Sequence, residues 1–176
     1  GVDFPGEGGN ILQPKKTAGP VGLATMAYGQ GIAVTPISLI TAVSSIANEG
    51  ILMKPRLVKE LIDSEGNIVE VFEPKVVGRS ISKQTASDML DIMEFVVEDG
   101  GAGAAKLPGY RIGGKTGTAS KPVPGGYSEE DVFASFIGIG PIEDPRVAVL
   151  VIVDSPRGVL YGSVTAAPVA GEIFKE

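Results

Sequence analysis

The hydrophobic residues of this chain follow two patterns, one with the spacing of a helix and one with the short apolar runs of strands. A first helical pattern follows Thr35-Pro36, an N-cap with proline at the first helical position. Its apolar members are Ile37, Ile40, Val43 and Ala47. Because Asn48-Glu49-Gly50 supplies a stop, the pattern predicts a helix over about residues 36–48.

A second helical pattern begins after Ser82, which can act as its N-cap. Its apolar residues mark one face: Ala86, Met89, Leu90, Met93, Val96 and Val97. The pattern predicts the longest helix of the chain, ending at Gly100-Gly101. A final helix is predicted around residues 168–174, whereas the first twenty-odd residues contain so many glycines and prolines that they are predicted to be loop.

Other apolar runs have the β-branched and aromatic composition of strands. Residues 110–119, 132–139 and 147–153 are separated by Pro/Gly-rich connections and predict an antiparallel meander. The continuous apolar character of residues 147–153 also predicts a strand buried on both faces, with helices against the sheet. Residues 57–62 and 68–72 flank a run of turn formers and predict a peripheral hairpin.

Together these elements predict an α+β fold in which helices flank an antiparallel sheet. No internal repeat or domain boundary is visible, so residues 1–176 are expected to belong to one domain. The longest apolar run, residues 147–153, is far shorter than the ~18 to 20 residues needed to cross a bilayer.

Composition and charge exclude several classes of function. A net charge of −6 and a pI near 4.8 argue against nucleic acid as a partner, since such proteins cluster Lys and Arg. The chain has neither Cys nor His, which removes zinc-finger sites, thiol nucleophiles and Ser-His-Asp arrangements. We expect no metal site, and the lack of Cys fits an extracytoplasmic protein.

One glycine-rich segment carries candidate chemistry. Residues 113–118, Gly-Gly-Lys-Thr-Gly-Thr, place a cation, two hydroxyls and bare backbone together, a set that suits an anionic oxygen ligand. Residues 109–116 also match the phosphate-loop pattern G-x-x-x-x-G-K-[ST], and residues 150–154 are typical of an apolar strand ending in a magnesium-holding Asp. A phosphate loop must follow a strand and open a helix, and residues 100–108 and 119–126 predict neither, so an NTPase is the less favoured interpretation.

The run Lys115-Thr116-Gly117-Thr118-Ala119 resembles the third signature of penicillin-binding proteins and related serine β-lactamases. Further segments resemble class B penicillin-binding proteins in the same order along the chain: Tyr28-Gly29-Gln30-Gly31-Ile32, Val34-Thr35-Pro36, Ile46-Ala47-Asn48-Glu49-Gly50, Pro55, Val96-Val97, Ala134-Ser135-Phe136-Ile137-Gly138, Tyr161-Gly162-Ser163 and Ala167-Pro168-Val169. The resemblance covers nearly the whole chain and implies the C-terminal part of a transpeptidase domain of the division or sporulation type.

In that family the signature strand edges a cleft in which a serine attacks a D-Ala-D-Ala peptide and passes the acyl group to an amine of another stem peptide. The resemblance implies that Lys115 is the cleft cation that supports proton transfer and the substrate carboxylate. Thr116 and Thr118 are implied to donate hydroxyl hydrogen bonds to that carboxylate, and the Thr118 backbone N–H to serve the oxyanion hole. Gly117 leaves room for a ligand against the strand.

The resemblance also implies partners and a location. Peptidoglycan stem peptides and β-lactam antibiotics are the implied ligands, and no cofactor is implied. The implied location is the extracytoplasmic face of the bacterial cell membrane, with the anchor outside this chain.

The family places its nucleophile and base in S-x-x-K and S-x-N signatures, and neither occurs here in a suitable context. Residues 80–83 match S-x-x-K as a string, but Ser82 is better explained as a helix cap, and residues 45–48 lie inside a predicted helix. We expect the chain to begin after the second signature, with the acylating serine on a preceding segment. The alternative is a non-catalytic fragment or binding module of the same fold, which exposed apolar surface would favour.

Other polar residues have simpler interpretations. Glu129, Glu130 and Asp131 are predicted to lie in a solvated loop rather than to line a substrate channel. Asp63 and Glu65 lie in a predicted turn, which gives little support to acid-base chemistry there. Tyr161 and Ser163 are equally consistent with a place at the cleft and with packing at a turn.

Overall fold

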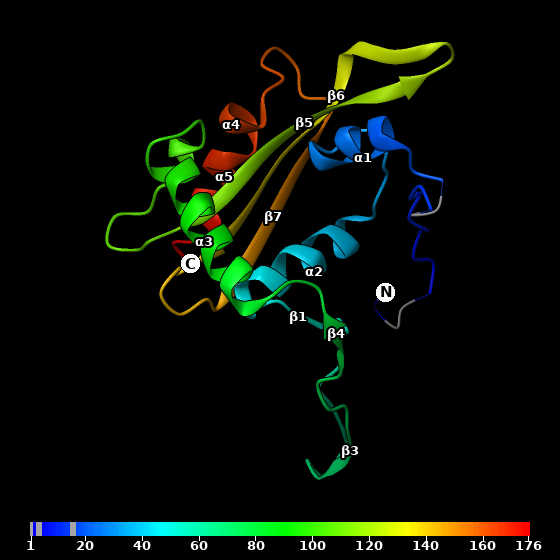
Figure 1. Cartoon of the computed structure of the whole chain (residues 1–176). Coiled ribbons are helices and arrows are strands. Elements are labelled where there is room, and N and C mark those ends of the chain that lie inside the picture. Colours follow the sequence, from blue (N-terminus) through cyan, green and yellow to red (C-terminus); the bar gives the residue numbers. More distant parts are fainter. Residues whose placement is uncertain (1, 3–4, 15–16) are drawn as a thin grey trace.

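The computed structural model describes residues 2, 5–14 and 17–176. Its helices are α1 (Pro20–Ala27), α2 (Pro36–Ala47), α3 (Lys83–Glu98), α4 (Gly162–Thr165) and α5 (Ala167–Ile173), with a 3₁₀ helix η1 (Gly103–Ala105). Its strands are β1 (Ile51–Met53), β2 (Glu60–Ile62), β3 (Ile68–Val71), β4 (Val76–Arg79), β5 (Gly113–Val123), β6 (Gly126–Gly140) and β7 (Val147–Asp154). The pairings are β1–β4, β2–β3 and β5–β6–β7, all antiparallel (Figure 1). The predicted α+β fold is confirmed.

The sheet β5–β6–β7 is the predicted meander. Its register places Lys115 opposite Ile137, and Ile137 opposite Leu150. β5 and β6 are joined by a tight turn in which Gly125 has a φ of +90°, a conformation that favours glycine.

The outer part of the β5–β6 hairpin corrects the sequence prediction. The expected loop between the strands is shorter, because β5 continues to Val123 and β6 begins at Gly126. A shift of register between Ser120 and Pro122 places the proline, which has no N–H, at an irregularity of the ladder. Residues 129–131 therefore lie in strand β6 and not in a solvated loop.

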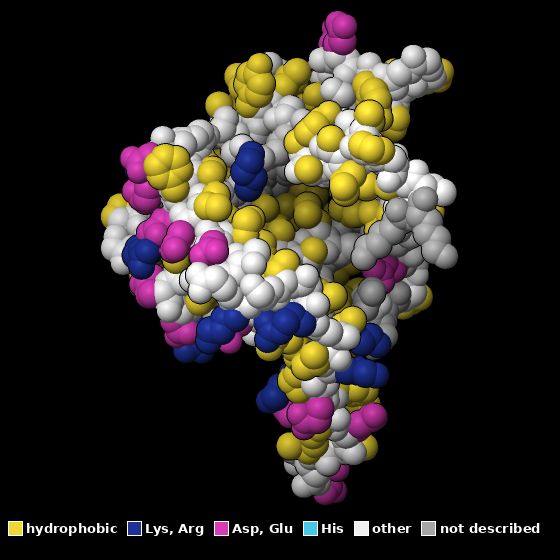
Figure 2. Space-filling view, viewed as in Figure 1, with side chains coloured by type: hydrophobic (Ala, Val, Ile, Leu, Met, Phe, Trp, Pro, Cys, Tyr) yellow, Lys and Arg dark blue, Asp and Glu magenta, His cyan; other side chains and the backbone are white. Residues whose placement is uncertain are grey.

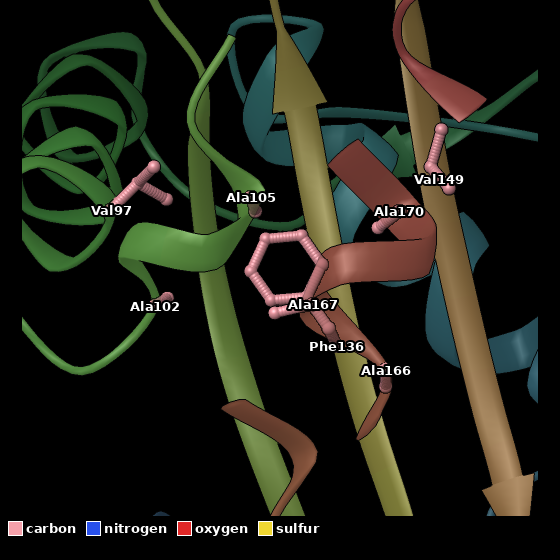
Figure 3. Close-up of a cluster of buried hydrophobic side chains, with 8 residues drawn as sticks. All are labelled: Val97, Ala102, Ala105, Phe136, Val149, Ala166, Ala167 and Ala170. Atoms are coloured by element: carbon pink, nitrogen blue, oxygen red, sulfur yellow. The ribbon is translucent and has the colours of Figure 1, made fainter. Parts of the chain in front are cut away.

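One face of this sheet packs against the C-terminal helices. Phe136 is fully buried at the centre of a cluster that consists otherwise of small aliphatic residues: Val97, Ala102, Ala105, Val149, Ala166, Ala167 and Ala170. Figure 3 shows the Phe136 ring between η1 and α5. The alanines let η1 and α5 approach the sheet closely. Helix α5 also confirms the helix predicted around residues 168–174.

Helices α2 and α3 cover parts of the opposite face and the β5 side of the sheet. The Thr35 hydroxyl accepts a hydrogen bond from Ser38 N at 3.2 Å, and the Ser82 hydroxyl accepts one from Thr85 N at 3.0 Å. These are the predicted N-caps, so both helix starts are confirmed. α3 lies so close to β5 that a side chain at Gly113 would meet Met93 and Glu94.

Strand β7 is less buried than its apolar sequence predicts. Val149 is 8% exposed, but Val147 is 52% and Ile152 is 39% exposed, so the prediction of burial on both faces is wrong. α2 covers only part of the face that carries Ala148 and Ile152, and within the described residues β7 pairs on one edge only.

The strands β1 to β4 form a long two-stranded ribbon that projects from the body (Figure 1). The pair β1–β4 lies next to the body, and the pair β2–β3 lies at the free end. The predicted peripheral hairpin is confirmed as β2 and β3. Its turn is closed by the Asp63 carboxylate, which accepts hydrogen bonds from the backbone N–H groups of Glu65 and Asn67, both at 2.9 Å. β1 and β4, which continue the ribbon toward the body, are absent from the sequence prediction because each is only three or four residues long.

The N-terminal segment corrects the expectation of an uninterrupted loop. Helix α1 begins at Pro20, a position where proline is tolerated because its missing N–H has no helical partner. No residue of α1 is buried, which explains why its sequence shows no apolar face. Residues 1, 3–4 and 15–16 of the predicted loop lie outside the described residues. Across the described part of the chain, no helix combines the length and apolar character needed to span a membrane.

Candidate active-site strand

Residues 115–118 lie in the first half of β5, and β5 is an edge strand. The strand order β5–β6–β7 leaves one side of β5 without a neighbour among the described residues. Alternate N–H and C=O groups of an edge strand point away from its partner. This edge therefore presents backbone donors and acceptors to an extended ligand.

Two glycines fix the position of β5 before Lys115. A side chain on Gly114 would meet the Phe136 ring and would lie 2.9 Å from the Ile137 carbonyl oxygen. A side chain on Gly113 would lie 2.7 Å from Ile142 Cδ1 on the other face. The absence of both side chains allows close packing on the two faces. The position of β5 between Phe136 and Ile142 is therefore fixed.

Lys115 is exposed, and its ammonium group remains near the strand edge. Its Nζ donates a hydrogen bond to the Thr116 carbonyl oxygen at 2.8 Å. Side chains alternate along a strand, so Lys115 and Gly117 share the face of Gly113 while Thr116 and Thr118 share the face of Phe136. A ligand lying along the edge can reach the cation from one face and the hydroxyls from the other.

Thr118 is exposed and lies against the start of α4. Its Oγ1 accepts a long hydrogen bond of 3.4 Å from Gly162 N. A side chain on Gly162 would collide with the Ser135 carbonyl oxygen and lie 2.7 Å from that of Gly117. Gly162 therefore sets how closely α4 approaches the signature strand, a role that sequence reasoning missed although residues 161–163 belong to the family resemblance.

Gly117 is constrained by β6. A side chain at Gly117 would lie 2.6 Å from Ser135 Oγ on the neighbouring strand. The glycine is thus required by packing, in addition to the room for a ligand that the sequence predicts. Ser135 is the second residue of this site that sequence reasoning did not single out, and its half-buried hydroxyl lies on the same face as Lys115.

Ion pairs hold the chain near both ends of β5. Ahead of the strand, the Arg111 guanidinium donates to both Glu94 oxygens of α3, at 2.6 and 2.5 Å, and this bond lowers the pKa of the Glu94 carboxyl. Near the far end, Lys121 pairs with Asp154 of β7 and lies 4.6 Å from the centre of the Phe133 ring. The Lys121 hydrogen bond lowers the pKa of the Asp154 carboxyl. Residues 115–118 lie between these two attachments.

The phosphate-loop interpretation of residues 109–116 is wrong. Residues 107–110 form a turn closed by a bridge between Leu107 and Tyr110, and the glycine-lysine segment runs directly into strand β5. No helix follows it, so no helix N-terminus points at a bound phosphate. Asp154, the residue expected to hold magnesium in that interpretation, pairs with Lys121 instead.

The S-x-x-K string at residues 80–83 does not form a nucleophile and base pair. The Ser80 hydroxyl lies 2.8 Å from the Ser45 hydroxyl, and Lys83 Nζ donates to the Glu49 carboxylate at 2.6 Å. Ser82 is the N-cap of α3, as predicted. Ser45 is 4% exposed within α2, in agreement with a packing role.

The remaining acidic residues show no acid-base arrangement. Hydrogen bonds from Asn67 lower the pKa of the Asp63 carboxyl, which is occupied in closing its turn. Tyr161 is 66% exposed and directly precedes Gly162, whose N–H contacts Thr118. In the part of the chain that the structure describes, no group of three or more Asp or Glu residues forms a metal-binding cluster.

Comparison with known proteins identifies the family of this strand. The profile of the penicillin binding protein transpeptidase domain matches residues 1–175. Stage V sporulation protein D of Bacillus subtilis is 42% identical over 178 residues, covering 100% of this chain and 28% of that protein. The peptidoglycan D,D-transpeptidase FtsI homolog of Mesostigma viride is 34% identical, covering 86% of this chain and 28% of that protein. The chain thus spans little more than a quarter of these relatives.

Solved structures of penicillin-binding proteins share the fold of this chain. The transpeptidase domain of penicillin-binding protein 3 from Burkholderia pseudomallei is 35% identical with a TM-score of 0.84, covering 99% of this chain and 51% of that one. Penicillin-binding protein 3 from Mycobacterium tuberculosis, solved with aztreonam, is 29% identical with a TM-score of 0.85, covering 98% of this chain and 41% of that one. The match over the whole chain and the edge strand with its Lys-Thr-Gly-Thr sequence lead to one conclusion: the chain belongs to the penicillin-binding protein transpeptidase family.

Proposed function

We propose that this chain supplies the signature strand of a peptidoglycan D,D-transpeptidase that cross-links cell-wall peptides by acyl-serine transfer. The observation that carries the proposal is the geometry of residues 115–118. They place a cation and two hydroxyls on opposite faces of one open strand edge. Such an edge suits an extended peptide that ends in a carboxylate, which is the form of a D-Ala-D-Ala stem.

Each residue of the strand has a proposed role. Lys115 is the cation that attracts the substrate carboxylate and supports proton transfer, and its ammonium needs only to leave the Thr116 carbonyl to do so. The hydroxyls of Thr116 and Thr118 donate hydrogen bonds to that carboxylate. The Thr118 backbone N–H is one oxyanion-hole donor, and Gly117 keeps the edge unobstructed.

The proposed reaction has two acyl transfers. A serine Oγ bonds to the carbonyl carbon of the penultimate D-Ala while the terminal D-Ala leaves as an amine and takes up a proton. An amine of a second stem peptide then attacks the ester, forms the new amide and releases the serine. β-Lactams enter the same site and acylate the serine in the first step.

The acylating serine is proposed to come from a segment other than residues 1–176, which form the C-terminal portion of the transpeptidase domain. A groove of about 690 Å³ between α2 and the β1–β4 ribbon supports this arrangement. The groove is lined by Ile37 and Ile40 of α2, Met53 of β1 and Ala148 of β7. Apolar surface of this kind favours association with another part of the domain.

The same apolar groove also favours a second candidate function, that of a binding module. A non-catalytic fragment of the same fold would use that surface to bind a partner and would never support acylation. The two candidates differ in whether the association creates a reactive serine.

The proposed partners are peptidoglycan stem peptides and β-lactams, with no cofactor and no nucleic acid. The proposed location is the extracytoplasmic face of the bacterial cell membrane, with the anchor outside this chain. The relatives named for sporulation and for D,D-transpeptidation support a role in the cell wall.

Intact mass spectrometry after incubation with a fluorescent penicillin tests the proposal. We expect no adduct on residues 1–176 alone, and one adduct on the serine segment when the preceding part of the domain is present. An adduct on the isolated chain would overturn the external position of the nucleophile and direct attention to Ser80. An unlabelled complete domain would overturn the transpeptidase function and favour the binding module.

A further inference from the structure

The ribbon of β1 to β4 is divided by charge along its length. Its outer part, residues 60–71, carries carboxylates and no Lys or Arg: Glu60, Asp63, Glu65 and Glu70. Its inner part, residues 54–59 and 72–75, carries four cations and one carboxylate: Lys54, Arg56, Lys59, Lys75 and Glu73. Figure 2 shows the Lys and Arg side chains toward the body and the Asp and Glu side chains toward the free end. We call these parts the basic base and the acidic tip.

The basic base is open between two backbone hydrogen bonds. Lys54 N donates to the Lys75 carbonyl at 2.8 Å and Phe72 N donates to the Lys59 carbonyl at 2.9 Å. Between these bonds, no backbone hydrogen bond joins residues 55–58 to residues 73–74 in the described chain. The ribbon therefore splays and forms a groove of about 530 Å³.

The groove is lined in a way that fits an acidic, apolar strand. Leu57 is 65% exposed and Phe72 is 37% exposed, so apolar surface is presented to solvent. Arg56 and Lys75 also line it, and neither forms an ion pair with a carboxylate of the described residues. Backbone groups without ladder partners, apolar walls and unpaired cations together suit an extended segment that carries carboxylates.

The acidic tip of the ribbon has the chemistry of that occupant. It is an extended hairpin whose apolar side chains are exposed, with Ile62 at 63% and Val69 at 67%. Glu65 and Glu70 supply negative charge, and neither forms an ion pair with a cation of the described residues. One copy of the chain therefore carries both halves of a complementary contact.

The spacing along the ribbon allows the contact to be reciprocal. Glu60 pairs with Val71 in register, and this pair lies five residues from Pro55 in the base and five from Glu65 in the tip. Two ribbons that lie antiparallel about this point place each tip on the partner's base, because strands advance by about 3.3 Å per residue. The arrangement is a closed two-fold contact. We propose that two copies of this chain associate through their ribbons, with the acidic tip of each in the basic groove of the other.

Analytical ultracentrifugation of the whole protein over a wide range of concentration and salt tests the proposal. We expect a dimer that weakens as ionic strength rises. Arg56→Glu with Lys75→Glu changes the net charge of the base from +3 to −1, and Glu60→Lys with Glu65→Lys and Glu70→Lys changes that of the tip from −4 to +2. Each of these two variants should weaken self-association by about tenfold or more, because a tip and a base of the same net charge then face each other.

An equimolar mixture of the two variants provides the decisive arm. In the mixed pair every tip again meets a base of opposite charge, so dimers should return. Arg146→Glu with Arg157→Glu is the matched control, since it changes the net charge as the base variant does but lies outside the ribbon. This control should dimerise as the native protein does, and circular dichroism shows that each variant is folded.

Three outcomes would overturn the proposal. The first is a protein that stays monomeric at low salt over the whole range, and the second is a mixture that does not restore the dimer. The third is weakening by the base variant but not by the tip variant, which would mean that the groove binds an acidic segment of this protein other than the tip.

Discussion

The sheet β5–β6–β7 and the ribbon β1–β4 with β2–β3 are both antiparallel, yet different interactions hold them. In the sheet, Phe136 and Ile139 are fully buried, and glycines allow contacts too close for any side chain. In the ribbon, every residue of β3 and β4 is exposed, and the shape depends on ladder hydrogen bonds and the Asp63 turn. The contrast teaches that packing sets the position of the signature strand, whereas local turn chemistry sets the ribbon.

The largest expected effect comes from removing the cation of the signature strand. In the complete transpeptidase domain, Lys115→Ala should slow acylation by penicillin by about 100 to 10,000-fold, the range typical of a lost proton-transfer group. The rate of fluorescent labelling measures this. Lys59→Ala in the ribbon is the control and should label at the native rate. A Lys115→Ala variant as fast as the control would remove Lys115 from the site.

The next effect tests the dependence of the sheet on its core. Phe136→Ala should lower the free energy of unfolding by about 3 to 5 kcal/mol, because it leaves a cavity among small side chains that cannot fill it. Val69→Ala in the ribbon should change it by less than about 0.5 kcal/mol, since that side chain is exposed. Urea unfolding measures both, and equal losses would contradict the contrast between the two regions.

A smaller effect tests the close approach of α4. Gly162→Ala should cost about 1 to 3 kcal/mol, because the added carbon meets the carbonyl oxygens of Ser135 and Gly117. It should also slow penicillin labelling of the complete domain, since α4 contacts Thr118. Gly66→Ala in the ribbon turn is the comparison. It has open space and a φ of +87°, so only backbone strain of about 1 kcal/mol is expected, with no change in labelling.

The smallest effect is the pH dependence of the ion pair ahead of β5. The Arg111 bond lowers the pKa of Glu94 below its ordinary value of 4.5 in the folded state. Its stabilisation is therefore complete above pH 4.5 and is lost as the pH falls through the lower folded value. Glu94→Gln should therefore make the midpoint of thermal unfolding depend slightly less on pH in that acid range. An unchanged curve would show that the pair does not fasten α3 to β5.

The sequence predicted those features that depend on neighbours along the chain. The limits of α2 and α3 follow from the caps at Thr35 and Ser82, and the hairpin of β2 and β3 follows from its turn residues. The signature residues 115–118 were also found from sequence, because their identities and spacing carry the family resemblance.

The features that sequence analysis missed depend on residues far apart in the chain. The pairing of β1 with β4 joins Ile51 to Arg79, and neither strand is long enough to show a pattern. Strand β7 reads as buried on both faces, but its exposure depends on how far α2 extends over it. Gly162 and Ser135 lie in segments that carry the family resemblance, but no local pattern shows that the fold brings their backbones together.

The sequence by itself determined which residues we propose to bear the chemistry, and it determined where most of the elements begin and end, because caps, turns and apolar periodicity act over a few residues. Tertiary structure alone decided which edge of the sheet stays open beside Lys115 and how closely α4 approaches Thr118. It also decided that the ribbon projects from the body, which leaves apolar side chains of both its ends exposed. These features arise from contacts between distant segments, whose energies no local pattern encodes.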